Sequence, residues 1–145
     1  MLRIGKLTDY ALLIMSEIAK APESVSSTTW LSDTLGLPVP TVSKVLKMLL
    51  DAQLVSSFRG AEGGYRLAKA AQAISVADII GAMEGELAMT ECCERANLCS
   101  LDTRCTMREN WKKINKMVYA VLAGFSIGDM LQPLPVINQE VLRGE

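Results

Sequence analysis

The amino-acid sequence predicts a mainly α-helical fold with a small β-hairpin wing: a winged helix-turn-helix followed by a long C-terminal dimerisation helix. Three observations lead to this prediction. Two short helical segments meet at a glycine at position 36, a glycine-rich hairpin follows at residues 54–68, and apolar residues recur in a heptad pattern over residues 107–125. Half of the 145 residues are apolar and only 5% are aromatic, so we expect an aliphatic core.

Two helices are expected at the N-terminus. The first has Thr8 as its N-cap and runs to about Lys20. The second, from about Thr28 to Leu35, is expected to stop at Gly36, because glycine readily adopts the left-handed conformation that ends a helix. The apolar face of the first helix is formed by Ala11, Ile14, Met15 and Ile18.

The segment after Gly36 has the pattern of a recognition helix, the helix that enters the major groove of DNA. Pro40 fits its first turn, where the missing N–H of proline costs no hydrogen bond. An ordinary helical hairpin with a solvated lysine face would have the same pattern. The expected buried face contains Val42, Val45, Leu46 and Leu49, and the opposite polar face carries Thr41, Lys44 and Lys47.

A β-hairpin directly after this helix favours DNA binding over that alternative. Residues 54–68 have the composition of two strands joined by a glycine-rich turn at 60–64. Arg59 and Arg66 flank the tip, and arginine suits the narrow, negative minor groove. Residues 1–72 are therefore predicted to form a winged helix-turn-helix that binds double-stranded DNA, although the net charge of the whole chain is only −1.

A connecting helix is expected within residues 73–91, with Ser75 as its N-cap and Gly85 at its end. At the other end of the chain, residues 133–145 contain two prolines and are expected to form a flexible tail.

Residues 104–132 are predicted to contain the dimerisation helix, from about Arg104 to Phe125, and a short C-terminal helix. Packing against its own domain would also bury an apolar stripe. The narrow seam favours the same helix of a second subunit, and a homodimer would present two recognition helices to a pseudo-palindromic operator. The seam consists of Met107, Trp111, Ile114, Val118, Val121 and Phe125.

All four cysteines lie in a predicted loop at residues 92–105, and the chain has no histidine. Five residues separate Cys93 from Cys99, and five separate Cys99 from Cys105. A disulfide in so short a segment would stabilise the fold little, and the gaps are wider than those of zinc ribbons. An iron–sulfur cluster is a larger body that a loop can wrap. Zinc and a metal-free redox-sensitive thiol stay open as alternatives. Adjacent cysteines project in different directions, so we expect Cys92 to be a bystander.

Together these motifs resemble the winged-helix iron–sulfur transcriptional regulators of the IscR/NsrR/RirA family, most of all the branch of SUF-system cluster assembly regulators. The resemblance spans about residues 1–132 and rests on LTDYAL, LVSSFRGAEGGYRLA, ISVADIIGAME and the cysteine spacing. It implies a cytoplasmic homodimer with one cluster per subunit. The state of that cluster would tune DNA binding and repression of a SUF-type iron–sulfur assembly operon.

The resemblance also assigns residues, with one departure. IscR-type members have a histidine three residues after the last cysteine, where this chain has Arg108. NsrR-type members use an N-terminal aspartate of the partner subunit, and Asp9 matches it, which favours a 4Fe–4S over a 2Fe–2S cluster. Asp9 would also stabilise the first turn of its helix through the helix dipole, and Cys92 or solvent are the other candidates for fourth ligand. The resemblance places cluster ligation on Cys93, Cys99 and Cys105, DNA contacts on Thr41, Ser43 and Lys44, and a minor-groove contact on Arg59.

Neither an enzyme nor a membrane protein is expected. The chain lacks histidine for acid–base chemistry, and the glycines at 60–64 lack the Gly-Lys-Ser/Thr ending of a phosphate-binding loop, so we expect no small-molecule substrate. No apolar run reaches the roughly 18 residues that would cross a bilayer. The N-terminus lacks the cleavage site of a signal peptide. The sequence therefore predicts a cytoplasmic DNA-binding transcriptional regulator.

Overall fold

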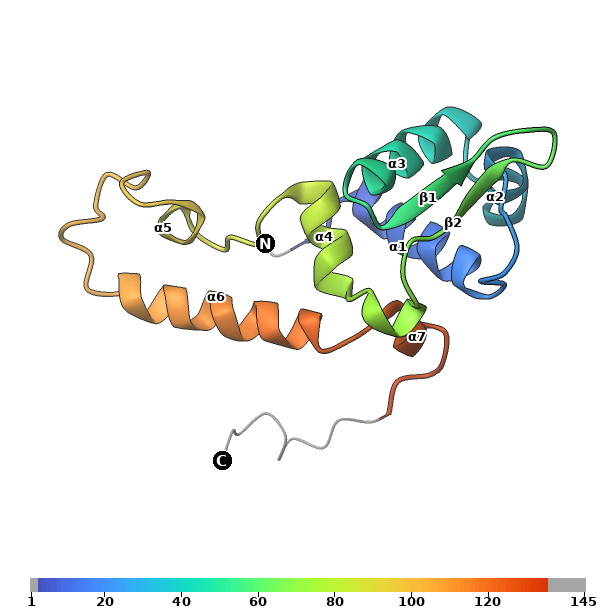
Figure 1. Ribbon diagram of the computed structural model, residues 1–145. Helices are drawn as coiled ribbons and strands as arrows, with labels where there is room; N and C mark the ends of the chain where they lie inside the picture. The colour runs from blue at the N-terminus through green and yellow to red at the C-terminus, as the bar shows by residue number, and fades with distance from the viewer. Residues whose placement is uncertain (1–2, 136–145) are drawn as a thin grey trace.

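The computed structural model describes residues 3–135 as a winged helix-turn-helix with a long helical arm (Figure 1). The N-terminal helices and the hairpin pack together, while α6 extends away from them (Figure 1). The predicted fold class is confirmed; of the predicted tail, residues 136–145 lie outside the described residues. The elements are α1 (Lys6–Ala19), α2 (Thr28–Leu35), α3 (Val39–Asp51), β1 (Val55–Phe58), β2 (Gly64–Leu67), the 3-10 turn η1 (Ala71–Ala73), α4 (Val76–Glu84), α5 (Glu91–Glu94), α6 (Arg108–Ala123) and α7 (Ile127–Met130).

Helix α1 lies at the centre of the core. It packs against α2, α3, α4, α7 and strand β2. Each large aliphatic side chain removed from water contributes roughly 1.5–3 kcal/mol. The buried faces predicted for α1 and α3 are confirmed. Ala11, Ile14, Met15 and Ile18 in α1, and Val42, Val45, Leu46 and Leu49 in α3, are all 0% exposed.

Helix α1 begins at Lys6 with Gly5 as its N-cap residue, so the prediction of Thr8 as N-cap is wrong. Thr8 is buried inside the helix, and its hydroxyl donates a hydrogen bond to Glu84 Oε1 at 2.5 Å. The same carboxylate oxygen accepts a hydrogen bond from the Gly5 N–H at 2.7 Å. The last residue of α4 therefore replaces a local cap, and it ties α4 to the start of α1.

Local hydrogen bonds close the helix-turn-helix, and the predicted end of α2 at Gly36 is confirmed. The Ser27 hydroxyl accepts from the Trp30 N–H at 3.1 Å and caps α2. Gly36 ends α2 with φ +66°, in the left-handed region. The Ser32 hydroxyl donates to the Leu37 carbonyl at 2.5 Å, which fixes the turn that leads into α3.

The wing is fastened to the segment that precedes α2. Strands β1 and β2 are antiparallel, with Val55 opposite Leu67 and Phe58 opposite Gly64. Ser26 exchanges two backbone hydrogen bonds with Tyr65, at 2.8 and 2.9 Å. Gly64 lies so close to this junction that a Cβ atom on it would be 2.3 Å from the Ser26 carbonyl oxygen. The position of the wing relative to α2 therefore depends on the absence of a side chain at residue 64.

The arm formed by residues 76–125 begins with α4, which packs on α1 and α3, and its end returns to the core beside the first residue of α4. The Val76 N–H donates to the Phe125 carbonyl at 2.8 Å, and the Ile127 N–H donates to the Ile74 carbonyl at 2.9 Å. Ile127, at the start of α7, is 0% exposed in the core. The long helix α6 is shorter than the predicted span from Arg104 to Phe125, because residues 101–107 form turns before it. No helix within residues 3–135 is long and apolar enough to cross a bilayer.

We predict that Gly64→Ala lowers the free energy of unfolding by about 2–4 kcal/mol, because the new Cβ would collide with the backbone of Ser26. Urea denaturation monitored by circular dichroism measures this change. Gly81→Ala is the matched control: no atom lies within 4 Å of a Cβ there, and alanine in a helix interior should stabilise by about 0.5–1 kcal/mol. Equal stability of the Gly64→Ala variant and the original protein would contradict this account of the wing junction.

Candidate nucleic-acid interface and cysteine loop

The polar face of α3 points away from the core. Ser43, Lys44 and Lys47 are exposed and Thr41 is half-buried. Within the described part of the chain, neither lysine forms an ion pair. The four buried residues of α3 hold this face outward, so the cations are available to phosphate groups.

The two arginines of the wing lie in different environments. Arg59 is exposed next to the tip. Arg66 is half-buried, and its guanidinium carbon lies 4.9 Å from the centre of the Phe58 ring, which is a cation–π contact. A groove of about 450 Å³ separates the wing from the start of α2 and is lined in part by Thr28, Ser57 and Arg59. Arg59 is therefore free to reach a ligand, while Arg66 is held against the wing.

The cysteine loop lies at the end of the arm away from the wing, with α5 packed alongside the N-terminal half of α6 (Figure 1). All four cysteines are free thiols and half-buried. Cys92 and Cys93 belong to the single turn α5, and both of their sulfur atoms contact the Thr90 hydroxyl. Within residues 3–135, no three histidine, cysteine or acidic side chains are gathered closely enough to hold a metal ion. The thiol donors suit an iron–sulfur cluster chemically, and a cluster held by Cys93, Cys99 and Cys105 would require these side chains to come closer together.

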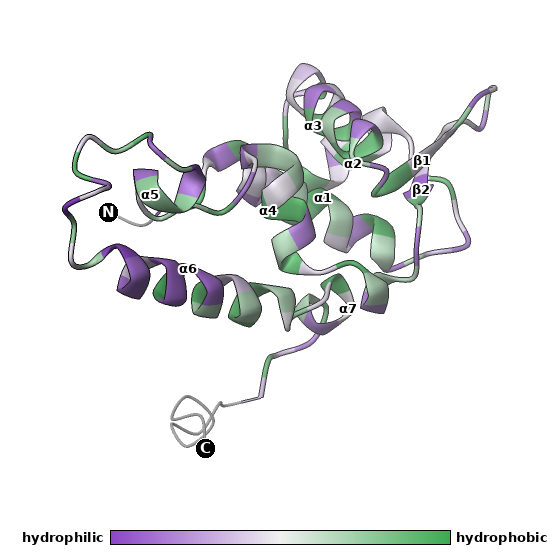
Figure 2. Ribbon diagram, turned by 60° about the vertical axis from the view of Figure 1, so that its left-hand side comes forward, coloured by the Kyte–Doolittle hydropathy of each residue, from purple (hydrophilic) through white to green (hydrophobic). Residues whose placement is uncertain are grey.

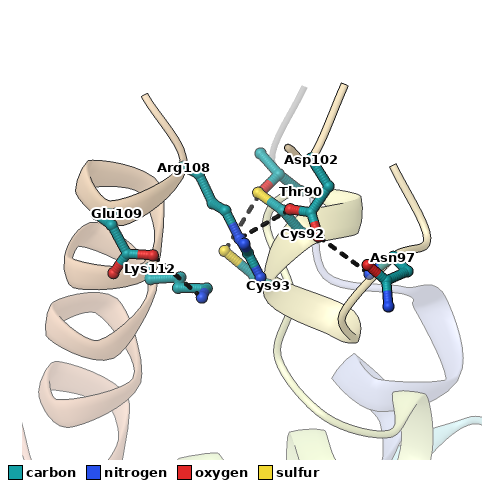
Figure 3. A network of polar contacts seen from close by, with 8 residues as sticks. All are labelled: Thr90, Cys92, Cys93, Asn97, Asp102, Arg108, Glu109 and Lys112. Carbon is teal, nitrogen blue, oxygen red and sulfur yellow. Dashed lines mark hydrogen bonds and ion pairs between the residues drawn. The ribbon is translucent and has the colours of Figure 1, made fainter. Parts of the chain in front are cut away.

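A buried ion pair ties the cysteine loop to α6 (Figure 3). Asp102 Oδ1 lies 2.8 Å from Arg108 Nε, and the Asn97 N–H donates to Asp102 Oδ2 at 3.0 Å. The side chain of Asp102 is 5% exposed and that of Arg108 is 29% exposed. Arg108 is the first residue of α6, so the loop and the helix are held to each other. The sequence signal for this contact was the arginine at the position of the IscR-type histidine, but its acidic partner was not predicted.

A second tie joins α6 to the segment after α4. Asn115 Nδ2 donates to the Leu87 carbonyl at 2.8 Å, and Asn115 Oδ1 accepts from the Met89 N–H at 2.9 Å. Sequence reasoning missed Asn115, because a polar residue in an amphipathic helix gives no sign of a distant backbone partner. The arm is therefore braced at its root, near its middle and at its far end.

Asp9 is exposed in the first turn of α1. Within the described residues of one chain it is not gathered with the cysteines. Its assignment as a ligand supplied to the partner subunit stays a prediction.

Helix α6 has no buried residue, although it carries the predicted apolar seam. Met107, Ile114 and Val121 are 60%, 42% and 49% exposed, and Met117 beside them is 64% exposed. The other seam residues, Trp111, Val118 and Phe125, are half-buried. Figure 2 shows hydrophilic residues gathered in the half of α6 near the cysteine loop and hydrophobic ones in the half near α7. A single chain thus leaves an apolar stripe on α6 uncovered.

The helix-turn-helix, the wing and the cysteine loop all lie within the part of the chain that matches a known family. Residues 4–133 match the Rrf2 family, described as an iron-dependent transcriptional regulator. The chain belongs to the Rrf2 family. It is a transcriptional regulator of a DNA-binding family, and its relatives are regulators and not enzymes, as the sequence predicted.

The similar proteins include two kinds of regulator, IscR and CymR. This Rrf2 protein is 28% identical over 133 residues to the HTH-type transcriptional regulator IscR of Vibrio atlanticus, a match that covers 89% of this chain and 75% of that relative. The structure of CymR, the global cysteine regulator of B. subtilis, is similar with a TM-score of 0.72 and 32% identity, over 90% of this chain and 97% of that one. T. potens IscR is similar with a TM-score of 0.69 and 29% identity, over 90% and 86%.

We predict that Asp102→Ala loosens the cysteine loop, because the charge of Arg108 loses its buried partner. Amide hydrogen exchange over residues 95–106 should become roughly tenfold faster, while exchange in α1 stays unchanged. Lys112→Ala is the control, since it removes an exposed ion pair to Glu109 on the same helix and should leave the loop unaffected. Equal loop exchange in both variants would show that the buried pair does not hold the loop.

Proposed function

We propose that this Rrf2-family protein is a homodimeric repressor whose cysteine loop senses an iron–sulfur cluster and thereby tunes binding to a pseudo-palindromic operator. The observation that carries the proposal is the placement of the cysteine loop. It lies at the end of an arm whose root is hydrogen-bonded to the core that holds the recognition helix. The family description as iron-dependent supports the choice of iron.

The uncovered stripe on α6 supports the dimer. Burying Met107, Ile114, Met117 and Val121 against the same helix of a second copy would remove these side chains from water. The two recognition helices would then face two half-sites related by the dimer axis. The DNA contacts in each subunit are made by Thr41, Ser43, Lys44 and Lys47 of α3 and by the wing arginines Arg59 and Arg66.

The cluster ligands in this proposal are Cys93, Cys99 and Cys105, with Asp9 of the partner subunit as a possible fourth ligand, and the cluster is of the 4Fe–4S type. When bound, the cluster supplies a redox- and iron-sensitive crosslink between parts of the loop. Contacts within the chain couple the loop to the rest of the arm. The ion pair of Asp102 with Arg108 couples the loop to α6, and the hydrogen bonds of Asn115 couple α6 to the segment after α4. The target we propose is a SUF-type cluster assembly operon.

A second candidate is a thiol-redox regulator without a cluster. Two observations favour it. The four cysteines, which all lie in the described part of the chain, are free and half-buried, and no three of them lie close enough to share a metal ion. The structure is also similar to that of the cysteine regulator CymR. The two candidates share the DNA interface and differ in what the cysteines do.

We predict that protein purified without oxygen is brown and contains iron and sulfide in about equal amounts. Absorption spectra together with iron, sulfide and zinc analysis measure this, and the iron count per subunit distinguishes a 4Fe–4S from a 2Fe–2S cluster. Cys99→Ala should lose the colour, whereas Lys113→Ala on the exposed face of α6 should keep it. Colourless protein that stays free of iron after reconstitution would favour the thiol-redox candidate, and bound zinc would indicate a structural metal site.

We predict that Lys44→Ala and Lys47→Ala each weaken binding to a duplex selected from a random pool. Each lysine that contacts a phosphate contributes about −0.9 to the slope of log affinity against log salt concentration. Each alanine variant should therefore have a slope that is less negative by about 0.9. Fluorescence anisotropy at several salt concentrations measures this slope. Lys113→Ala, which lies on the arm, should bind as the original protein does. An unchanged slope in both α3 variants would exclude this face of α3 from the interface.

A further inference from the structure

The two adjacent cysteines are oriented together and not apart. The Thr90 hydroxyl oxygen lies 3.1 Å from Cys92 Sγ and 3.2 Å from Cys93 Sγ (Figure 3). Both side chains therefore reach back toward Thr90, the N-cap residue of α5. Cys92 thus contacts the same hydroxyl as Cys93, and its expected role as a bystander to the cluster stays a prediction.

The donor and the acceptor of each of these two hydrogen bonds can be assigned. A threonine hydroxyl has one hydrogen, and Thr90 donates it to Cys93 Sγ. In the second contact the Cys92 thiol must then be the donor and the Thr90 oxygen the acceptor. One hydroxyl thus holds two neighbouring sulfur atoms in place before any ligand arrives.

One cysteine of the pair borders a cavity. Cys93 lines a cavity of about 370 Å³ between the segment after α4 and helix α6. Leu87 and Tyr119 provide apolar walls, and Glu86, Asn115 and Lys116 provide polar ones. Neither Cys92 nor Cys93 is fully buried, and neither is part of a disulfide.

We propose that Cys92 and Cys93 form a binding site for a trivalent thiophilic metalloid, with arsenite as the simplest ligand. A divalent zinc ion needs four protein donors in a structural site, and within the described residues no three donors are gathered. Trivalent arsenic is soft and is bound well by two thiolates, so a pair of neighbouring sulfur atoms is sufficient. The pair by itself therefore offers the two sulfur donors that the metalloid needs.

The binding step balances without a change of oxidation state. Arsenous acid carries three hydroxyl groups on arsenic. The two thiols each lose a proton and form an As–S bond, two As–O bonds break, and two hydroxyl groups leave as water with those protons. Arsenic stays trivalent and keeps its third hydroxyl group, and neither an oxidant nor a reductant is consumed.

This site does not rest on the proposed cluster, although both would use Cys93. The metalloid needs Cys92, whereas the cluster needs Cys99 and Cys105. Variants of these residues therefore separate the two inferences.

The test is binding of arsenite, and of phenylarsine oxide as a dithiol probe, to the cluster-free full-length chain. Native mass spectrometry without oxygen and without thiol reductants gives the stoichiometry, and titration gives the affinity. We expect one equivalent on the original protein and one on the Cys99→Ser/Cys105→Ser double variant. Cys92→Ser should bind at least roughly tenfold more weakly, a loss of about 1.4 kcal/mol. Thr90→Val, which keeps the shape and removes the hydroxyl, should retain the stoichiometry with lower affinity.

Circular dichroism establishes that each variant is folded, and iron and sulfide loading of Cys92→Ser gives an independent readout. Loading equal to that of the original protein, with arsenite binding lost, supports a separate dithiol site. Unchanged arsenite affinity in Cys92→Ser, or a loss that appears only in the Cys99→Ser/Cys105→Ser variant, would overturn the proposal. If neither the original protein nor any variant loads a cluster, the proposed cluster function is rejected. The arsenite measurements then still test the dithiol site.

Discussion

The closure of the arm at its root is the constraint on which the rest of this structure depends. Backbone hydrogen bonds join residues 74–76 to residues 125–127, and Ile127 is fully buried beside them. Because α4 packs in the core and the chain returns beside its first residue, the cysteine loop and α6 are connected to the DNA-binding core at both of their ends. A loop that was attached at one end alone could change shape without affecting the core.

Helix α1 carries this connection to the interface. It packs on α3, whose outer face bears the lysines, and on α4 and α7, which form the root of the arm. Glu84 strengthens the junction, since one carboxylate oxygen accepts hydrogen bonds from both Gly5 and Thr8 at the start of α1. A displacement of α4 would therefore move α1, and with it the base on which α3 rests. Packed helices are not continuously deformable, so such a change is expected to occur between discrete arrangements.

Much of the fold could be predicted because its signals are local. The buried faces of α1 and α3 follow from helical spacing, and Ser27, Gly36 and Ser75 cap helices through neighbours within a few positions. The errors occurred where a distant residue replaces a local partner. Thr8 was expected to cap α1, but its hydroxyl is bonded to a residue that follows it by 76 positions. The Asp102–Arg108 pair and the common orientation of Cys92 and Cys93 likewise depend on the path of a loop, which periodicity does not encode.

The central claim is that the state of the cysteine loop sets the affinity for DNA through the arm. The most direct test compares the dissociation constant of one selected duplex for the cluster-free and the reconstituted protein, without oxygen and at one salt concentration. Cys99→Ala, treated in the same way, is the reference. The account predicts a change of at least roughly tenfold in the original protein and none in the variant. Equal affinities of the cluster-free and the cluster-loaded protein would contradict it.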